Sequence, residues 1–352
     1  EAGYHTTSLS KIFHPGCGTD DKHSWSEKAW KPPFDKRYSN SWVALNSSFP
    51  DYNTSLLPDG LTAVKANATL SSMAAGAKQG TPFFLAVGMH KPHLPWIFPE
   101  RFLDLYPPAT VPLAKNPFAP KHSPTCAEFE YGSLKKFGDM ELMCNTSGNA
   151  CSPYVGPIPD QKAKELRRAY HAATSWTDFL VGGLLAKLDE LAMTNSTVIA
   201  YVSDHGYKLG EHASWEKQTL WKDSILTPFI LSVPGWRTGS VHSELVEHID
   251  LAPTLAEICG VAPPAGEGSA WEGVSLMPLL RRDANAAAKN ATFASCRHGE
   301  NEAQLPAALH GGTVHGSSIT TFRYKYIEWP VWNQSGLCPQ RVWNESGGRE
   351  LY

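Results

Sequence analysis

The chain alternates short apolar runs with longer segments whose apolar residues recur every three or four positions. The runs at residues 82–88, 197–203 and 225–233 are apolar, and the second is rich in β-branched and aromatic residues. Such runs are typical of strands that are buried within a sheet. Because predicted helices lie between and after them, we expect an α/β sheet that is covered on both faces.

The longest predicted helix runs from residue 160, with Asp160 as its cap, to about residue 193. Its apolar side chains share one face: Leu166, Tyr170, Ala173, Leu180, Leu184, Leu188 and Leu191. A second helix begins at Asp250 as its cap and stops at Gly260, a common C-terminal residue of helices. Cys259 lies in this apolar helix, so we expect its thiol to be buried.

The character of the chain changes near residue 284. Residues 285–289 are rich in Ala, and residues 320–329 alternate aromatic and polar side chains like an exposed antiparallel strand. We therefore expect a main domain over residues 1–284 and a smaller antiparallel subdomain over 285–352. Two segments, 1–80 and 107–160, are rich in residues that favour loops, and the second is predicted to be a surface excursion.

Charge and hydropathy exclude two classes of partner. The chain has 31 Lys and Arg against 34 Asp and Glu, and it lacks a basic run that would suggest a nucleic-acid face. Its apolar runs are far too short to cross a bilayer, so we expect no membrane span. The chain begins at Glu1 without a signal peptide, and we interpret it as a mature or truncated product.

Asparagine sequons indicate the compartment. Eight Asn-x-Ser/Thr sequences occur, at Asn46, Asn53, Asn67, Asn145, Asn195, Asn290, Asn333 and Asn344. Chance gives about two with ordinary Ser and Thr usage. We therefore expect a glycoprotein of the secretory pathway, lysosomal or extracellular, over a cytosolic protein with accidental sequons. The seven Cys residues fit that pathway, and their odd number leaves one thiol free or paired outside this chain.

Ser203, Asp204, His205 and Gly206 directly follow the second apolar run. The carboxyl ends of strands form the binding crevice of open α/β sheets. An Asp-His pair placed there can hold a metal, and Gly206 lets the backbone turn sharply beneath it. From these four residues alone, a metal site and a simple capped turn both remain open.

Three other segments place cations where they could meet this pair. His90 and His93 follow the first apolar run, and we expect His93 to be functional and His90 structural. Lys217 is a point charge suited to an oxyanion of sulfate or phosphate, although a solvated surface lysine would look the same. Lys11 and His14 would share a face on a helical turn, which by itself is a weak signal.

Together these segments resemble the type I sulfatases of the alkaline-phosphatase superfamily, and within them the iduronate-sulfatase-like branch. The resemblance rests on GYHT…KIFHPG, FFLAVGMHKPHLPW, TVIAYVSDHG, LGEHASWEK, PFILSVPG, IDLAPTLAEICG and EGVSLMPLL, in this order. It implies a mixed sheet sandwiched by helices, with a smaller antiparallel C-terminal subdomain. It also implies a sulfuric ester hydrolase that acts on a sulfated sugar, with a uronic-acid-containing glycan as the expected substrate.

The resemblance also implies roles for single residues. Asp204 and His205 would contribute to a Ca²⁺ site, in which Asp204 is the firmer ligand because calcium prefers oxygen. Lys217 and His93 would bind the sulfate and the leaving oxygen. Lys11 is expected to join them in substrate binding and catalysis.

The nucleophile of the family is a formylglycine made from Cys in a Cys-x-Pro-x-Arg segment, and Lys11 and His14 would flank it. This chain contains no such segment. The nearest sequence begins at Cys151 and has Val155 in place of the Arg. The paired Asp of the family's first strand is absent as well, and a family Gly before Lys11 is Ser10 here. We therefore expect the nucleophile to lie before Glu1, and this piece alone to be inactive and to fold poorly.

Two alternatives to a sulfatase remain open from the sequence. A zinc phosphodiesterase of the same superfamily would also use an Asp-His-Gly segment for metal ligands. A non-catalytic relative that binds sulfated glycan would keep Lys217 and His93 without ever having the Cys.

Overall fold

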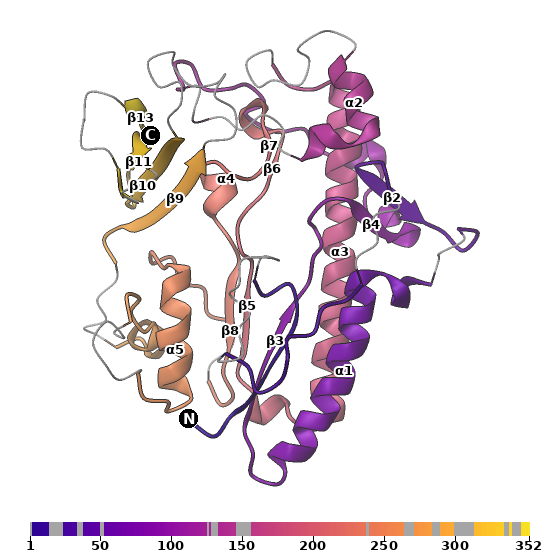
Figure 1. Cartoon of the computed structure of the whole chain (residues 1–352), viewed down its shortest axis with the longest axis vertical. Coiled ribbons are helices and arrows are strands. Elements are labelled where there is room, and N and C mark those ends of the chain that lie inside the picture. Colours follow the sequence, from indigo (N-terminus) through magenta and orange to yellow (C-terminus); the bar gives the residue numbers. More distant parts are fainter. Residues whose placement is uncertain are drawn as a thin grey trace.

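The computed structural model describes residues 2–13, 24–33, 38–49, 53–124, 127, 133–145, 156–236, 239–263, 271–283, 289–298, 313–333, 338–339 and 346–352. Two long helices, α1 (Pro58–Ala77) and α3 (Asp160–Glu190), pack side by side along one flank of the molecule (Figure 1). The C-terminal sheet lies on the opposite flank. Short strands occupy the space between, and their carboxyl ends form the site described below.

Helix α3 confirms the longest predicted helix, although Asp160 is its first residue and Pro159 takes the cap position. The prediction that residues 1–80 are loop-rich was wrong, because α1 fills 20 of them. Its buried positions are mostly small, such as Ala63 and Ala66, so the apolar stripe is weak in the sequence. The sequence does mark the start of this helix, with Pro58 at its first position and Asp59 in its first turn.

The remaining helical elements are short. The α-helices are α2 (Gly138–Asn145), α4 (Lys222–Ile225), α5 (Leu251–Ile258) and α6 (Met277–Arg281). The 3₁₀ turns include η1 (Thr54–Leu56), η2 (Glu100–Leu105), η3 (Pro108–Thr110), η5 (Leu134–Lys136), η6 (Thr194–Ser196), η7 (Glu211–Ala213) and η8 (His248–Asp250). No helix within these described ranges is long and apolar enough to cross a bilayer.

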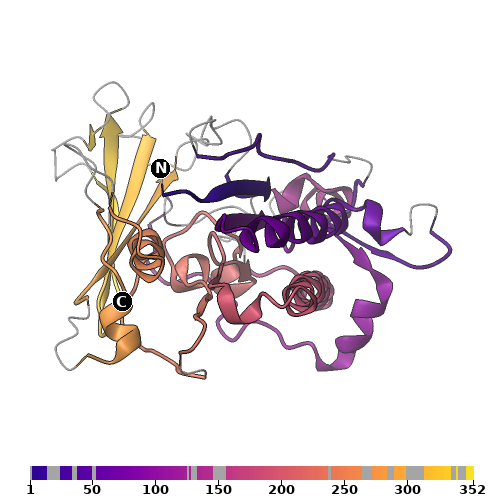
Figure 2. The same ribbon diagram turned by 90° about the horizontal axis from the view of Figure 1, so that it is seen from below.

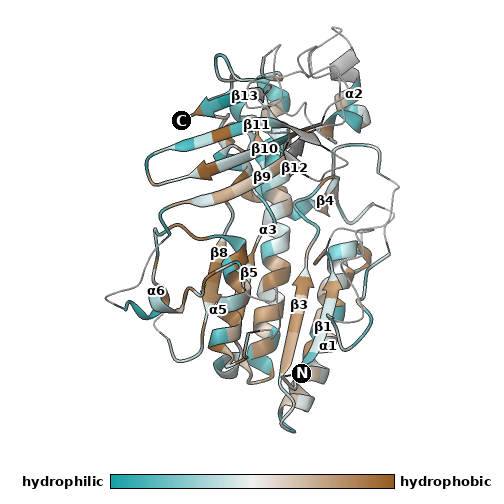
Figure 3. Ribbon diagram, turned by 60° about the vertical axis from the view of Figure 1, so that its left-hand side comes forward, coloured by the Kyte–Doolittle hydropathy of each residue, from teal (hydrophilic) through white to brown (hydrophobic). Residues whose placement is uncertain are grey.

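The strands of the main domain form two-stranded pairs. β1 (His5–Ser10) runs parallel to β3 (Phe83–Gly88), β2 (Trp42–Leu45) runs parallel to β4 (Trp96–Pro99), β5 (Ile199–Val202) is antiparallel to β8 (Phe229–Ser232), and β6 (Lys208–Leu209) is antiparallel to β7 (Trp215–Glu216). Figure 3 shows β8, β5, β3 and β1 following one another across the molecule, with mainly apolar residues along β8, β5 and β3.

These strands are less buried than the sequence predicts. Tyr201 and Val202 of β5 are 41% and 38% exposed, and Phe84 of β3 is 44% exposed. Within the described chain, β5 is hydrogen-bonded only to β8, and β3 only to β1, so their facing edges are unpaired. The expectation of strands buried on both faces was therefore wrong here, because the sheet is open between β3 and β5.

The main core lies between α3, β4 and β7. Trp96, Phe98, Leu166 and Trp215 are almost completely buried within it. Leu134 is also fully buried in this core, as is Met140 of α2. The prediction that residues 107–160 form a surface excursion is therefore wrong for this part, because its apolar residues anchor the segment in the core.

The C-terminal sheet is antiparallel, as the sequence predicts. Its strands are β9 (Thr292–His298), β10 (Thr313–Thr320), β11 (Lys325–Asn333), β12 (Cys338–Pro339) and β13 (Ser346–Leu351), in the order β12-β11-β10-β9 with β13 beside β11. Figure 2 shows this sheet as a separate layer at one side of the molecule. Trp329 and Ile327 pack there against Leu220 and Trp221 of the main domain. The predicted boundary at residue 284 lies outside the described residues and stays a prediction.

Three local predictions were wrong. Asp250 does not cap α5 with its side chain; it is fully buried and accepts hydrogen bonds from Glu247 N, Val274 N and Lys289 Nζ. Cys259 is exposed and not buried, because α5 ends just before it. In the third apolar run, which was expected to be a strand over residues 225–233, Ile225 is the last residue of α4 and the strand is limited to β8.

Candidate functional site

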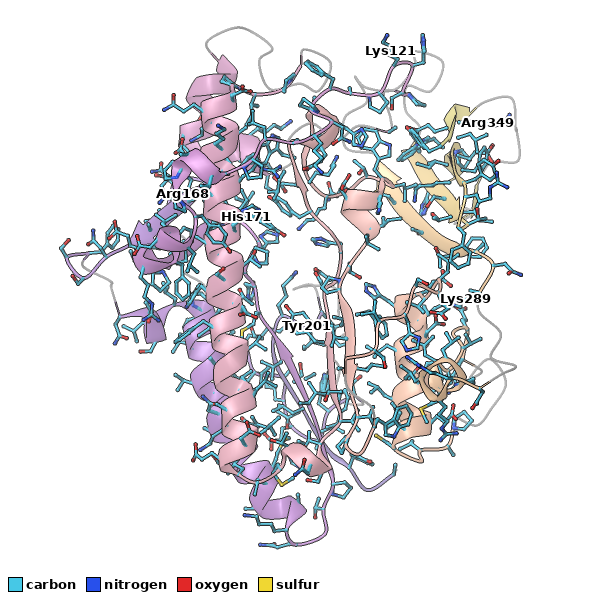
Figure 4. The ribbon with its side chains drawn as sticks, turned by 180° about the vertical axis from the view of Figure 1, so that it is seen from behind. Lys121, Arg168, His171, Tyr201, Lys289 and Arg349 are labelled. Atoms are coloured by element: carbon cyan, nitrogen blue, oxygen red, sulfur yellow. The ribbon has the colours of Figure 1, made fainter. Side chains whose placement is uncertain are left out.

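Four segments that are distant in the sequence meet at the carboxyl ends of the central strands. Lys11 follows β1, residues 90–95 follow β3, Asp204 follows β5, and Lys217 follows β7. Figure 4 labels Tyr201 on β5 and His171 on α3, which are two of the elements around this region. His14, the remaining predicted site residue, lies outside the described residues.

Lys11 and Asp204 form the central ion pair. The Lys11 ammonium donates to Asp204 Oδ2 at 2.7 Å, and His205 Nε2 lies 3.4 Å from the same oxygen. Burial acts to raise the pKa of Asp204, but the hydrogen bond from Lys11 and the charges around it outweigh that effect and lower the pKa below its usual value. Asp204 is therefore ionised at neutral pH, and it directly faces a cation.

Glycines let the backbones approach closely at two strand ends. A Cβ atom at Gly88 would lie 1.9 Å from the carbonyl oxygen of Lys11, and one at Gly206 would lie 2.1 Å from that of Asp223. Gly206 N also donates to Ser224 O at 2.8 Å. These contacts require glycine at both positions, and they fix the positions of the two turns that carry Lys11 and Asp204.

Ser10 adopts a conformation that glycine would adopt more easily. Its φ is +66°, in the left-handed region, and its side chain is almost fully buried. Its hydroxyl lies 3.4 Å from His90 Nδ1. Ser10 thus holds a left-handed backbone conformation at a cost in strain.

A buried carboxylate organises the turn after β3. Asp59 of α1 accepts hydrogen bonds from His90 N and Lys91 N, both at 2.8 Å, and is 1% exposed. His90 Nδ1 lies 3.7 Å from the same carboxylate. Lys91 Nζ in turn donates to His93 O at 3.0 Å. These contacts agree with a structural role for His90, and they hold His93 in place.

His93 is a neutral ring in this environment. Burial lowers its pKa to about 4, and the nearby ammonium groups of Lys217, Lys91 and Lys11 act in the same direction. Its Nδ1 lies 2.7 Å from the carbonyl oxygen of Leu94, so in the neutral ring Nδ1–H donates and Nε2 carries the free lone pair. The ring can therefore take up a proton at Nε2 when a negative group arrives.

Lys217 is part of this site and is not a solvated surface lysine. Burial lowers its pKa, and Lys11 lowers it further, whereas Glu216 and Asp204 act to raise it. Its charge in turn shifts the pKa values of His93, Asp204 and His205. The structure thus brings together Lys11, His93, Asp204, His205 and Lys217, and the catalytic and metal-binding roles expected of them stay predictions.

Sequence reasoning missed several residues that shape the site. Asp59 had no motif of its own, although an acidic residue in the first turn of a helix was a usable signal. Tyr170 was interpreted as a core residue of the α3 stripe, but it stacks on Tyr207 with ring centroids 4.9 Å apart. Asp204 contributes to the raised pKa of Tyr170, which reaches about 12 mainly through burial. Tyr170 therefore lies near the ion pair, and its stacking on Tyr207 connects it to the main core.

The described residues do not by themselves fit a calcium ion. Calcium takes about six to eight oxygen ligands. Asp204 is the carboxylate here, and its Oδ2 is already engaged by Lys11. Across the described ranges, no group of three or more His, Cys, Asp or Glu side chains could hold a metal. A calcium site would need oxygen ligands beyond these.

Comparisons with known proteins agree with this geometry. Residues 1–261 match the family model described as Sulfatase, and residues 210–334 match that described as N-sulphoglucosamine sulphohydrolase, C-terminal. Iduronate 2-sulfatase of Homo sapiens is 35% identical over 306 residues, which cover 75% of this chain and 54% of that protein. The chain thus spans about half the length of the curated relatives that it matches.

Solved structures show the same fold at low identity. A protein in complex with its substrate D-glucosamine-2-N,6-O-disulfate gives a TM-score of 0.66 at 19% identity, covering 100% of this chain and 73% of that chain. Phosphonate monoester hydrolase of Agrobacterium radiobacter gives 0.63 at 17% identity, covering 96% and 72%. These likenesses confirm the expected mixed α/β sheet with an antiparallel C-terminal sheet. Since the sulfatase family model matches residues 1–261, which are most of the chain, the chain belongs to the sulfatase family.

Proposed function

We propose that this protein is a sulfuric ester hydrolase that removes sulfate from a sulfated sugar. The observation that carries the proposal is the convergence of Lys11, His93 and Lys217 at the carboxyl ends of β1, β3 and β7. Two ammonium groups and a ring that gains a proton suit an anion with several oxygens. Membership of the sulfatase family supports sulfate as that anion.

The described residues would bind and orient the ester and move a proton. Lys217 and Lys11 would contact the sulfate oxygens, and the Lys11 ammonium would also stay beside Asp204. His93 would hold a proton at Nε2, because Nδ1 is engaged by the Leu94 carbonyl, and would deliver it to the leaving oxygen. Asp59 would keep His93 in place through the turn that it anchors.

The proposed substrate is a glycan that contains uronic acid. Its support is the 35% identity to human iduronate 2-sulfatase. Tyr170, whose pKa Asp204 influences, places an aromatic ring near the ion pair, which suits the C–H face of a sugar.

The proposed nucleophile is a formylglycine on a segment that this sequence does not contain, since no Cys-x-Pro-x-Arg occurs in it. The Ca²⁺ site belongs to the same proposal, with Asp204 and His205 supplying part of it and further oxygens coming from that segment. We propose in addition that the protein is a glycoprotein of the secretory pathway. The exposed positions of Asn46, Asn53 and Asn195 support glycan attachment there.

The test is hydrolysis of an aryl sulfate by protein expressed from the whole coding sequence. We expect turnover of 4-nitrocatechol sulfate, and a loss of about tenfold or more in kcat/KM for Lys217→Ala because a charged contact to the anion disappears. Lys187→Ala, on the exposed end of α3, is the matched control and should leave kcat/KM unchanged.

Two outcomes would overturn the proposal in favour of its alternatives. Turnover of bis(4-nitrophenyl) phosphate with tight zinc, and none of the sulfate ester, would indicate the zinc phosphodiesterase. Binding of a sulfated glycan without any turnover, in a protein whose complete gene lacks Cys-x-Pro-x-Arg, would indicate a non-catalytic binding protein.

A further inference from the structure

Lys217 is carried by a segment with an unusual backbone. Glu216 and Gln218, its two neighbours, both have φ of +68°, and His212 and Ala213 earlier in the segment have φ of +55° and +53°. Left-handed backbone costs a non-glycine residue roughly 1–2 kcal/mol, so it persists only where other contacts hold it. The left-handed backbone on both sides of Lys217 must therefore be held by contacts with other parts of the chain.

The side chain of Glu216 makes such a contact. It is 3% exposed, and its Oε1 accepts the backbone N–H of Leu134 at 2.5 Å. Leu134 is itself fully buried in the main core, so it is a fixed point. Hydrogen bonds from Leu134 and Ser133 thus connect the strand that precedes Lys217 to a segment about 82 residues away in the sequence.

The surroundings of Glu216 are polar on one side and apolar on the other. The groups that face it from the neighbouring elements are Ser133, Leu134, Tyr207, Lys208 and Lys217. Burial raises the pKa of Glu216 to about 7, against the hydrogen bond from Leu134 N and the charge of Lys217. The carboxyl therefore gains its charge close to neutral pH, directly beside the lysine that faces the site.

We propose that Glu216 is a positioning residue for Lys217: its anchored carboxyl holds the left-handed turn that presents the Lys217 ammonium to the bound anion. The inference rests on the proposed function for the identity of that anion, sulfate. The role of Glu216 can be tested without catalysis, because it concerns only the position of the Lys217 ammonium group. Glu216 itself would touch neither substrate nor the reacting atoms.

Titration of inorganic sulfate into the protein from the whole coding sequence, followed by calorimetry, tests the coupling. We expect Lys217→Ala and Glu216→Ala each to weaken sulfate binding by about tenfold at pH 6. The double variant should be no weaker than Lys217→Ala alone, because both changes remove the same contact. Wild-type affinity in Glu216→Ala, or additive losses in the double variant, would overturn the proposal.

Glu216→Gln tests the same idea without removing the anchor, and it covers the case in which Glu216→Ala fails to fold. The amide oxygen can still accept from Leu134 N, so sulfate affinity at pH 6 should stay within about twofold of wild type. Between pH 6 and 8 the wild type should lose affinity on the order of tenfold as Glu216 gains charge, whereas the variant should lose less than about twofold. A loss of about tenfold in Glu216→Gln at pH 6, where the hydrogen bond from Leu134 N is kept, would overturn the proposal.

Glu350→Gln is the matched control. Glu350 is also buried, at 7% exposed, and it accepts from Trp329 Nε1 at 2.9 Å in the C-terminal sheet. Its replacement should leave both the sulfate affinity and its pH profile unchanged; a shift like that of Glu216→Gln would show that any buried carboxyl has this effect and would reject the specific role. Absence of aryl sulfate turnover would count against the proposed function alone, since these measurements use binding.

Discussion

At the scale of single residues, the site combines groups whose protonation depends on burial and on neighbouring ammonium groups. His93 and Glu216 are shifted in opposite directions, with the pKa of the first lowered to about 4 and that of the second raised to about 7. Both groups are therefore favoured in their neutral forms inside the fold. Because each pKa differs between the folded and unfolded chain, the free energy of unfolding depends on pH in a way that the sequence alone does not predict.

The titration of His93 gives the first prediction. In the free protein we expect the ring to titrate at about 4, and saturating sulfate should raise this pKa by about one unit or more, because an anion favours the imidazolium form. Nuclear magnetic resonance of the ring protons measures it. His171, on α3 with its own lowered pKa, serves as the reference ring and should not respond to sulfate. An unchanged His93 would mean that its ring does not face the anion.

The stability of the protein should fall as the pH rises through neutrality, in part because of Glu216. Its folded pKa of about 7 exceeds the ordinary value of 4.5, so its contribution is complete below about pH 4.5 and is lost as the pH passes 7. The shift corresponds to about 3 kcal/mol at most. Urea unfolding between pH 5 and 8 should show a smaller loss of stability in Glu216→Gln than in wild type; identical slopes would refute the assignment.

Ser10 provides a test of backbone strain. Replacement of Ser10 by Gly should stabilise the protein by about 0.5–1 kcal/mol, because φ of +66° suits glycine. This gain is net of the lost contact between the Ser10 hydroxyl and His90. Ser8→Gly is the control: Ser8 is equally buried in β1 but is not among the residues with positive φ, so glycine there should destabilise. Thermal melts of both variants decide the matter, and destabilisation by Ser10→Gly would contradict the strain argument.

At the scale of elements, the site depends on strand ends that are pressed against neighbouring backbone. In the turn that carries Asp204, Gly206 lies against the backbone of α4 at Asp223. At the end of β3, Gly88 lies against the backbone of Lys11. Neither contact involves a side chain that a motif would reveal. The short strands carry the charged residues of the site at their ends, and these close backbone contacts set the distance between Lys11 and Asp204.

Gly206→Ala tests the role of the turn after β5. The added methyl would meet Asp223 O at 2.1 Å, so the turn must move, and we expect a loss of stability of about 2 kcal/mol or more together with weaker sulfate binding. Gly183→Ala in α3 is the matched control, because open space surrounds its Cβ position. That change should stabilise the helix by up to about 1 kcal/mol. Similar behaviour of the two variants would reject the close-contact argument.

At the scale of the whole molecule, the central sheet is open. The edges of β3 and β5 face each other without pairing in the described chain, and Tyr201, Ile230 and Phe84 are exposed beside them. Unpaired strand edges with apolar side chains favour association with other chains. Another strand placed there would pair both edges and cover these side chains.

The isolated chain of 352 residues should therefore behave poorly in solution. We expect no aryl sulfate turnover, a broad thermal transition and binding of the dye ANS, because the facing edges of β3 and β5 are unpaired in the described residues and the sequence contains no Cys-x-Pro-x-Arg. Differential scanning calorimetry and dye titration measure this. Protein from the whole coding sequence is the comparison and should melt cooperatively. A sharp melt of the isolated chain without dye binding would contradict the prediction.

The sequence by itself determined the family, the long helix α3, the antiparallel C-terminal sheet and the cationic segments of the site. It could do so because periodicity and short motifs are local, and because strand ends of an α/β sheet converge. The tertiary structure decided that α1 exists despite its small buried residues, that Asp59 anchors the turn that holds His93, and that β3 and β5 do not pair with each other within the described residues. It also revealed Glu216 behind Lys217. These features depend on burial and on contacts between distant residues, which no local pattern encodes.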